Sequence, residues 1–235
     1  MTTAINSLLF RRVTARGFRP SHVAEVGVWH PETSMVLPYI HDGVRTTLVE
    51  PDPDSIVLIK EAFAGRENVT LHPVAACDFS GTVELCKRES STFVSFLSSS
   101  PALVNDDCDI SRTETFTAEA RLFSEIDDGT IDLLSVDTEG SEWFVVKNLK
   151  SRPAVISVET HGGMYRNPYL REIKAWMADN RYRLWYRDKS DSVYVKQDAI
   201  SVSFWDRLGL LGSAVMLPVK ATRKRLSRWI KKTVR

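Results

Sequence analysis

Acidic residues follow five short apolar runs, and their repetition is the first sign of chemistry in this chain. Runs of this kind are typical of buried strands. Carboxylates that gather at one edge of a sheet repel one another, so the pattern favours a cationic ligand among them. The alternative is that each acid caps the helix that follows it. The five segments are Glu25-Val26-Gly27, Val49-Glu50-Pro51, Ala75-Ala76-Cys77-Asp78, Asp137-Thr138-Glu139-Gly140 and Glu159-Thr160-His161.

Three of these segments suit an adenosine-containing ligand. An acid such as Glu50, at the end of a second parallel strand, can accept hydrogen bonds from both hydroxyls of a ribose. Gly27 lets the backbone approach a ligand closely in the first turn. Ala76 and Asp78, at the end of the third strand, are candidates for contacts with an adenine.

The turn after the first strand argues against a dinucleotide. A dinucleotide site usually has the pattern G-x-G-x-x-G, so that a pyrophosphate can lie on a helix N-terminus. Residues 27–32 here read G-V-W-H-P-E, with one glycine, and Glu25 and Glu32 would repel a pyrophosphate. A cationic sulfonium with an ammonium group is a better electrostatic match. An NAD-dependent oxidoreductase is disfavoured further because no Tyr-x-x-x-Lys pair is evident.

Alternating strands and helices are expected to position these residues. Such alternation predicts a largely parallel sheet, in which ligands bind outside the carboxyl ends of the strands. Residues 90–109 are polar and rich in serine, and we expect a loop or flap there. The expected strands are 23–28, 46–49, 69–76, 82–86, 131–136 and 153–158, with a late antiparallel pair at 183–186 and 192–195. The expected helices are 33–40, 53–63, 116–126, 141–149 and 168–180.

Residues 131–149 resemble the signature of FkbM-type methyltransferases. They read I-D-L-L-S-V-D-T-E-G-S-E-W-F-V-V-K-N-L: an apolar strand, the motif D-x-E-G-x-E, and a helix that ends near a leucine. Weaker matches extend the resemblance over about 21–198. It implies a class I methyltransferase (Rossmann-like) fold, a three-layer α/β sandwich with a mostly parallel seven-stranded sheet and a late antiparallel hairpin.

The resemblance also implies a reaction and a set of site residues. The reaction is transfer of a methyl group from S-adenosyl-L-methionine, usually to oxygen, on a sugar, a glycan or another hydroxylated small molecule. By position, Glu25 and Gly27 would contact the methionine part, Glu50 the ribose and Asp78 the adenine. Asp137 would border the cofactor and, with Glu139, face the methyl acceptor.

The first loop departs from the family pattern. Family members often have D-x-G-A-N-x-G, whereas residues 25–31 here read E-V-G-V-W-H-P. We therefore expect Trp29 and His30 to intrude on the cofactor pocket. A non-catalytic nucleotide-binding or membrane-targeting module with a degenerate site stays open as an alternative function.

Asp137, Glu159 and His161 can be interpreted in three ways, and the first two explain how an acceptor hydroxyl would lose its proton. Asp137, Glu159 and His161, with Glu139 nearby, could hold Mg²⁺ or Mn²⁺, which would lower the pKa of the hydroxyl. Without a metal, His161 could be the general base, oriented by Glu159 or Asp137. In a third interpretation, His161 makes only a structural hydrogen bond.

Charge divides the chain into an acidic body and a basic tail. Residues 1–206 have a net charge of −8, whereas residues 207–235 carry nine Lys or Arg and no acid. We expect a helical, basic segment at 1–20, a methyltransferase domain at 21–198 and a basic amphipathic tail at 199–235. The tail could lie on an anionic membrane or pack on the acidic body; nucleic acid is a weaker candidate.

The cysteines and the hydropathy pattern indicate in which cellular compartment the protein is expected. Cys77, Cys86 and Cys108 are odd in number and lack a CxxC spacing, which disfavours a disulfide framework or a zinc site. A reducing, cytoplasmic compartment is the simpler expectation, with peripheral contact at the inner membrane face through the tail. No stretch of the sequence reaches the ~20 apolar residues of a membrane span.

Overall fold

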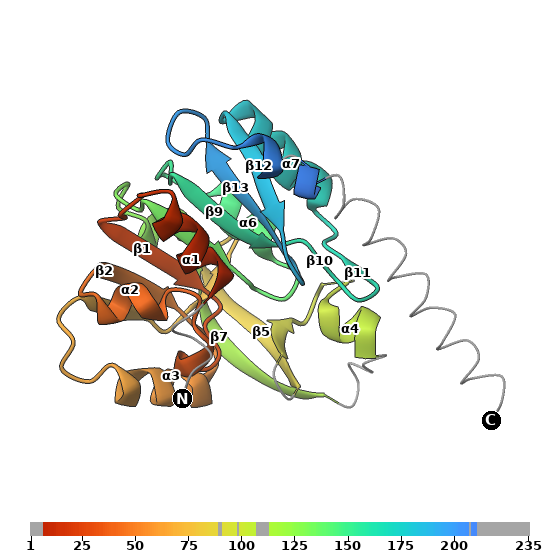
Figure 1. The fold of residues 1–235 in the computed structure, drawn as a ribbon. Coiled ribbons are helices and arrows are strands. Elements are labelled where there is room, and N and C mark those ends of the chain that lie inside the picture. Colours follow the sequence, from red (N-terminus) through yellow and green to blue (C-terminus); the bar gives the residue numbers. More distant parts are fainter. Residues whose placement is uncertain (1–6, 89–90, 98, 107–112, 207, 211–235) are drawn as a thin grey trace, which may run out of the picture.

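Seven strands form the main sheet of the computed structural model, which describes residues 7–88, 91–97, 99–106, 113–206 and 208–210. Their order is β12-β13-β9-β8-β1-β2-β3 (Figure 1). Strands β3, β2, β1, β8 and β9 are parallel, and β13 runs antiparallel to both of its neighbours. Their bounds are β1 (His22–Val26), β2 (Arg45–Val49), β3 (Val69–His72), β8 (Leu133–Val136), β9 (Val155–Glu159), β12 (Tyr182–Arg187) and β13 (Asp191–Lys196).

Helices cover both faces of this sheet. Val23 packs in one apolar core with α1, α2 and α3, and the next residue, Ala24, packs in a second core with α5, α6 and α7. A strand buried on both faces is expected to be mostly apolar, and β1 and β8 are buried along their whole length. The predicted three-layer sandwich with a late antiparallel hairpin is therefore confirmed. The helices are α1 (Leu8–Ala15), α2 (Leu37–His41), α3 (Pro53–Ala62), α5 (Phe123–Ile126), α6 (Glu142–Lys147) and α7 (Leu170–Asp179).

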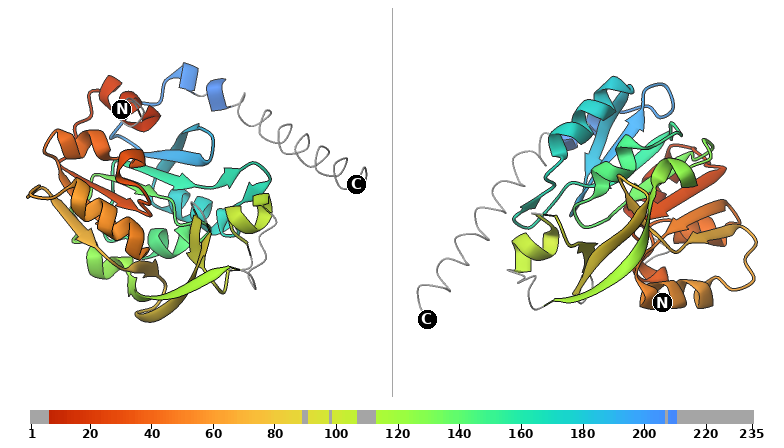
Figure 2. Two further views of the ribbon diagram at one scale, coloured as in Figure 1. Left: turned by 90° about the horizontal axis from the view of Figure 1, so that it is seen from below. Right: turned by 180° about the vertical axis from the view of Figure 1, so that it is seen from behind.

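A second sheet is inserted between the third and fourth strands of the main one. Its order is β4-β7-β5-β6, and it lies beyond the carboxyl ends of the main strands, next to α4 (Figure 2). The sequence did not predict this sheet as a unit. Its elements are β4 (Ala75–Cys77), β5 (Gly81–Arg88), β6 (Ser91–Val94) and β7 (Glu114–Leu122), with α4 at Pro101–Asp106.

The predicted helix at 116–126 was wrong over most of its length. Residues 114–122 form strand β7, and only 123–126 are helical. Phe116, Ala118 and Ala120 alternate with more exposed residues and pack in one cluster, which is the period of a strand. Because β7 pairs with β5 over seven residue pairs and also with β4, tertiary pairing outweighs the helix propensity of its alanines and glutamates.

Two other segments differ from expectation. The predicted loop at 90–109 contains strand β6 and helix α4 within its described part, and Phe93 and Val94 of β6 are buried. The predicted strand at 69–76 is two strands, β3 and β4, separated at Pro73, which has no N–H to donate to a sheet.

The ends of the chain are only partly described. The helix expected within 1–20 is α1, which buries Leu9 and Val13, and its Arg16 pairs with Asp206 at 2.5 Å. The predicted basic tail lies outside the described residues except for 199–206 and 208–210. Among the described helices, none combines the length and the apolar character needed to cross a membrane.

Candidate active site

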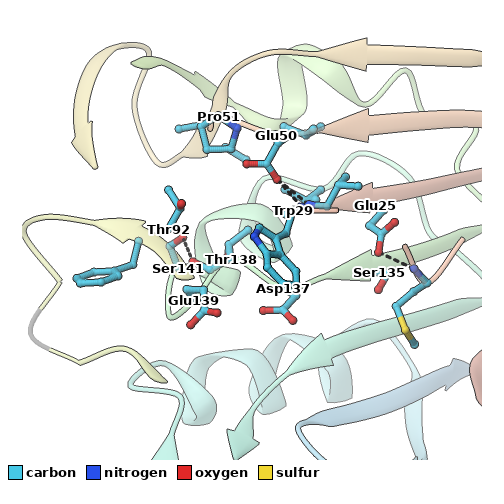
Figure 3. Close-up of a pocket in the computed structure, with 18 of the residues that line it drawn as sticks. Glu25, Trp29, Glu50, Pro51, Thr92, Ser135, Asp137, Thr138, Glu139 and Ser141 are labelled. Atoms are coloured by element: carbon cyan, nitrogen blue, oxygen red, sulfur yellow. Dashed lines mark hydrogen bonds between the residues drawn. The ribbon is translucent and has the colours of Figure 1, made fainter. Parts of the chain in front are cut away.

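A cavity of about 730 Å³ lies at the carboxyl end of the main sheet (Figure 3). Its volume is in the range of small-molecule sites. Residues that follow β1, β2 and β8, the second sheet and the turn between β12 and β13 all contribute to its wall. The predicted site residues that line it are Glu25, Gly27, Glu50, Ala76, Asp137 and Glu139. Asp78, Glu159 and His161 are not among the lining residues.

Gly27 brings the first loop against the backbone of β8. Its φ of +83° belongs to the left-handed region, which glycine adopts without strain. A Cβ on Gly27 would lie 1.7 Å from the carbonyl oxygen of Asp137. The two strand ends can therefore meet only because residue 27 has no side chain.

Glu50 holds the first loop from inside. Its Oε2 accepts hydrogen bonds from the N–H groups of Val28 at 2.8 Å and Trp29 at 2.9 Å (Figure 3), and its Oε1 accepts one from Asp52 at 2.9 Å. Burial raises the pKa of Glu50, although these backbone bonds oppose the shift. Because a carboxylate offers about four acceptor positions, one remains for a ligand.

Glu25 is a buried acid at the end of β1. It accepts hydrogen bonds from the hydroxyl of Ser34 and, at 2.8 Å, from the N–H of Met35. Burial raises its pKa to about 7. A cation in the cavity would favour the ionised form and would bind most tightly when Glu25 is ionised.

Another part of the wall is apolar. It faces the cavity mainly from the ends of β2 and β3 and from the second sheet. A planar, mostly apolar group can lie there with little loss of hydrogen bonding. The residues are Val49, Pro51, Val74, Ala75, Ala76, Leu85, Phe93 and Val94.

Asp137, Glu142 and Glu159 form a group of carboxylates beside the cavity. One oxygen from each lies within 4.8 Å of those of the other two. Asp137 opens to the cavity, whereas Glu142 and Glu159 are buried. Burial, and then repulsion by the neighbouring carboxylates, raises the pKa of Glu159 well above the usual range. The same two causes raise the pKa of Asp137, although its side chain is open to the cavity.

Hydrogen bonds fix the position of Glu142. Its Oε1 accepts from the N–H groups of Thr138 at 2.9 Å and Gly140 at 3.0 Å, and its Oε2 accepts from the side-chain amide of Asn167. The site residues chosen from the sequence did not include Glu142. It is the last acid of D-x-E-G-x-E, and its place in that motif was the available signal.

His161 is held away from this group. Its Nε2 lies 3.3 Å from the carbonyl oxygen of Asp188, and its Nδ1 lies 2.9 Å from the hydroxyl of Thr160. A carbonyl only accepts, so Nε2 carries the proton of the neutral ring. Burial lowers the pKa of His161. The structure therefore joins Asp137 and Glu159 with Glu142 instead of His161, and both nitrogens of His161 have partners within the protein.

Glu139 and Asp78 lie at different distances from the cavity. Glu139 lines it, has a φ of +55° and accepts a hydrogen bond from the Ser91 hydroxyl at 3.0 Å. Asp78 instead pairs with Lys147 of α6 at 3.1 Å. Because Asp78 does not line the cavity, the adenine contact predicted for it would need the side chain to move.

Comparisons with known proteins assign most of the chain to one family. A family model described as the methyltransferase FkbM domain matches residues 21–184, from before β1 into β12. None of the curated proteins matches the chain. The ribosomal protein L11 methylase from Lactobacillus delbrueckii subsp. bulgaricus is similar over 80% of this chain and 76% of its own, with 12% identity and a TM-score of 0.43. M. capricolum TrmK, solved with S-adenosyl-homocysteine, is similar over 81% of this chain and 67% of its own, with 12% identity and a TM-score of 0.40.

Proposed function

The chain belongs to the FkbM methyltransferase family, and we propose that it transfers the methyl group of S-adenosyl-L-methionine to a hydroxyl of a sugar, a glycan or another hydroxylated small molecule. One observation carries this proposal. The lining of the cavity combines apolar side chains with the carboxylates of Glu25, Glu50 and Asp137. That combination matches a cationic ligand that contains an adenosine.

In this proposal, different residues of the cavity contact different parts of the cofactor. S-adenosyl-L-methionine supplies an electrophilic methyl group on a sulfonium. Glu50 has one acceptor position left for a ribose hydroxyl, and the apolar wall around Ala76 suits the adenine. Glu25, when ionised, balances the ammonium group at the methionine end.

The acceptor side of the cavity is rich in hydrogen-bond acceptors. Asp137 and Glu139 line the cavity together with Asp188 and Lys189 of the turn after β12 and with Asp191, the first residue of β13. Carboxylates accept hydrogen bonds from sugar hydroxyls, and this supports a hydroxylated acceptor.

A divalent cation would assist the same step by lowering the pKa of the hydroxyl. Asp137, Glu142 and Glu159 supply three oxygen donors, and Oε2 of Glu159 is buried without a hydrogen-bond partner among the described residues. These residues fit Mg²⁺ or Mn²⁺, which prefer oxygen ligands.

Calorimetry tests the cofactor, and a methyl-transfer assay tests the reaction. We expect S-adenosylhomocysteine to bind in a one-to-one ratio and NAD to give no heat, because Glu25 and the single glycine of the first loop do not suit a pyrophosphate. Labelled S-adenosyl-L-methionine should methylate at least one member of a panel of sugars and other hydroxylated compounds. Binding of NAD without S-adenosylhomocysteine would contradict the cofactor. Binding without transfer to any acceptor, together with an Asp137→Ala variant that retains full cellular function, would favour a non-catalytic module.

Cofactor affinity should depend on pH through Glu25. Its pKa is about 7, so lowering the pH from 8 to 6 protonates it and removes the charge that faces the ammonium. We expect binding of S-adenosylhomocysteine to weaken about tenfold over this range. Glu25→Gln should bind weakly at both values and show no such dependence, and a wild-type affinity that is the same at pH 6 and pH 8 would contradict the role of Glu25.

The stability of the ligand-free protein should fall as the pH rises, whereas cofactor affinity should increase. The pKa of Glu25 is higher in the folded protein than its ordinary value of 4.5, so the folded state binds the proton more tightly. The contribution of Glu25 to stability is therefore complete below pH 4.5 and is lost as the pH rises to about 7. Urea unfolding of wild type and Glu25→Gln across this range separates this effect from ligand binding.

A further inference from the structure

The carboxylates of Asp137, Glu142 and Glu159 lie together without a balancing cation from the protein. Within the described part of the chain, none of the three forms an ion pair with a lysine or arginine. Three ionised carboxylates at this separation, two of which are buried, repel one another strongly. A sheet gains no stability from such a group, so its presence requires either bound protons or a cation.

Unsatisfied polar atoms surround the same place. The hydroxyls of Thr138 and Tyr165 and Oε2 of Glu159 are buried and have no hydrogen-bond partner among the described residues. Glu159 is only 7% exposed and Tyr165 only 2% exposed. Burial raises the pKa of Tyr165, and repulsion by Glu142 and Glu159 raises it further, which puts its hydroxyl near the carboxylates. Because buried polar atoms are nearly always paired, several unpaired oxygens around one point indicate a ligand that binds oxygen.

We propose that Asp137, Glu142 and Glu159 bind a divalent cation of the class that prefers oxygen ligands: Mg²⁺, Mn²⁺ or Ca²⁺. Because one oxygen of each lies within 4.8 Å of the other two, an ion placed between them is at most about 2.8 Å from each oxygen. The side chains therefore need to approach by at most a few tenths of an ångström for Ca²⁺, at about 2.3–2.6 Å, and by somewhat more for the smaller Mg²⁺. All three donors are carboxylate oxygens, which excludes the softer metals that select sulfur.

The surroundings hold the ligands in place. Thr138, Gly140 and Asn167 donate hydrogen bonds to Glu142 and orient its carboxylate, as outer partners do for metal ligands. Asp137 opens to the cavity, so an ion bound to it is reachable from the cavity. The position of the ion follows from the carboxylates alone. Its role, to lower the pKa of an acceptor hydroxyl, rests on the proposed methyl transfer.

Direct titration tests the site without cofactor or acceptor. Protein freed of metal with a chelator is titrated with Mg²⁺ and Ca²⁺ by calorimetry and with Mn²⁺ by electron paramagnetic resonance. We expect one ion per chain. Glu159→Gln should bind at least tenfold more weakly, because it removes a charged ligand whose Oε2 has no hydrogen-bond partner among the described residues. Glu61→Gln, the same change at an exposed position of α3, should bind as wild type does. Absence of saturable binding in wild type, or equal affinity in Glu159→Gln, would overturn the proposal.

Thermal unfolding distinguishes a ligand from a structural residue. In chelator, Glu159→Gln should unfold at the same temperature as wild type or higher, since it relieves repulsion among the carboxylates. In Ca²⁺, wild type should gain stability and the variant should not. A variant that is less stable than wild type by the same amount in both conditions would assign Glu159 a packing role and overturn the site. Cation binding in a protein that methylates no hydroxyl would leave the site standing and remove the proposed function.

Discussion

Replacement of Gly27 by alanine is expected to destabilise the protein by about 3 kcal/mol or more and to abolish cofactor binding. The new Cβ would lie 1.7 Å from the carbonyl oxygen of Asp137, a contact with backbone that no change of rotamer can relieve. The first loop or the end of β8 must therefore move. Both line the cavity, so the displacement disrupts the cofactor site as well as the fold.

Gly65 provides the matched control for this prediction. Its φ of +74° is close to that of Gly27, at +83°, but a Cβ there meets nothing within 4 Å. Gly65→Ala should therefore show only the cost of a left-handed alanine, roughly 1–2 kcal/mol. Urea denaturation of the two variants gives the cost of the close approach by difference. Equal destabilisation would mean that the contact with Asp137 is relieved at no cost.

Glu50→Ala is expected to weaken binding of S-adenosylhomocysteine by about 100-fold, equivalent to about 2.8 kcal/mol. The substitution removes the acceptor proposed for the ribose. It also leaves the N–H groups of Val28, Trp29 and Asp52 without their carboxylate, so the first loop loses its inner support. Stability should fall too, because each unpaired buried donor costs about 1–3 kcal/mol before water enters the cavity.

Glu50→Gln separates the two effects of that substitution. The amide oxygen can still accept hydrogen bonds from Val28 and Trp29, whereas the amide nitrogen would face the N–H of Asp52. We expect the stability and the affinity of Glu50→Gln to lie between those of wild type and of Glu50→Ala. Calorimetry and urea unfolding of the three proteins test this order. Affinity for S-adenosylhomocysteine within threefold of wild type in Glu50→Ala would contradict the assignment.

The sheet and the location of the site could be predicted because both depend on local signals. Apolar runs identify β1, β2, β8 and β9, and the carboxyl ends of parallel strands must meet at one edge. Glu25, Glu50 and Asp137 line one cavity for that reason. The second sheet could not be predicted in the same way. Strand β7 contains several residues that favour helices, and its structure depends on pairing with residues 27 to 39 positions away.

The chemistry around Asp137 was predictable only in part. The sequence places Glu159 and His161 two residues apart, but it does not show that His161 turns toward Asp188 and Thr160. Glu142 enters the group because a short turn at Thr138–Ser141 folds the chain back on its own strand end. This turn depends on the positive φ values of Glu139 and Gly140. Such backbone angles cannot be inferred from the pattern of residue types alone.

The position of β13 has a consequence for how the protein is made. Strand β13 is the last strand in the sequence, and it pairs with β9 on one side and β12 on the other. Strand β12 therefore cannot join the sheet until residues 191–196 have left the ribosome. Until then the edge of β9 can pair with other chains. The family match ends at residue 184, and a fragment cut there would lack β13 and its Asp191. Recombinant expression should therefore extend at least through Lys196.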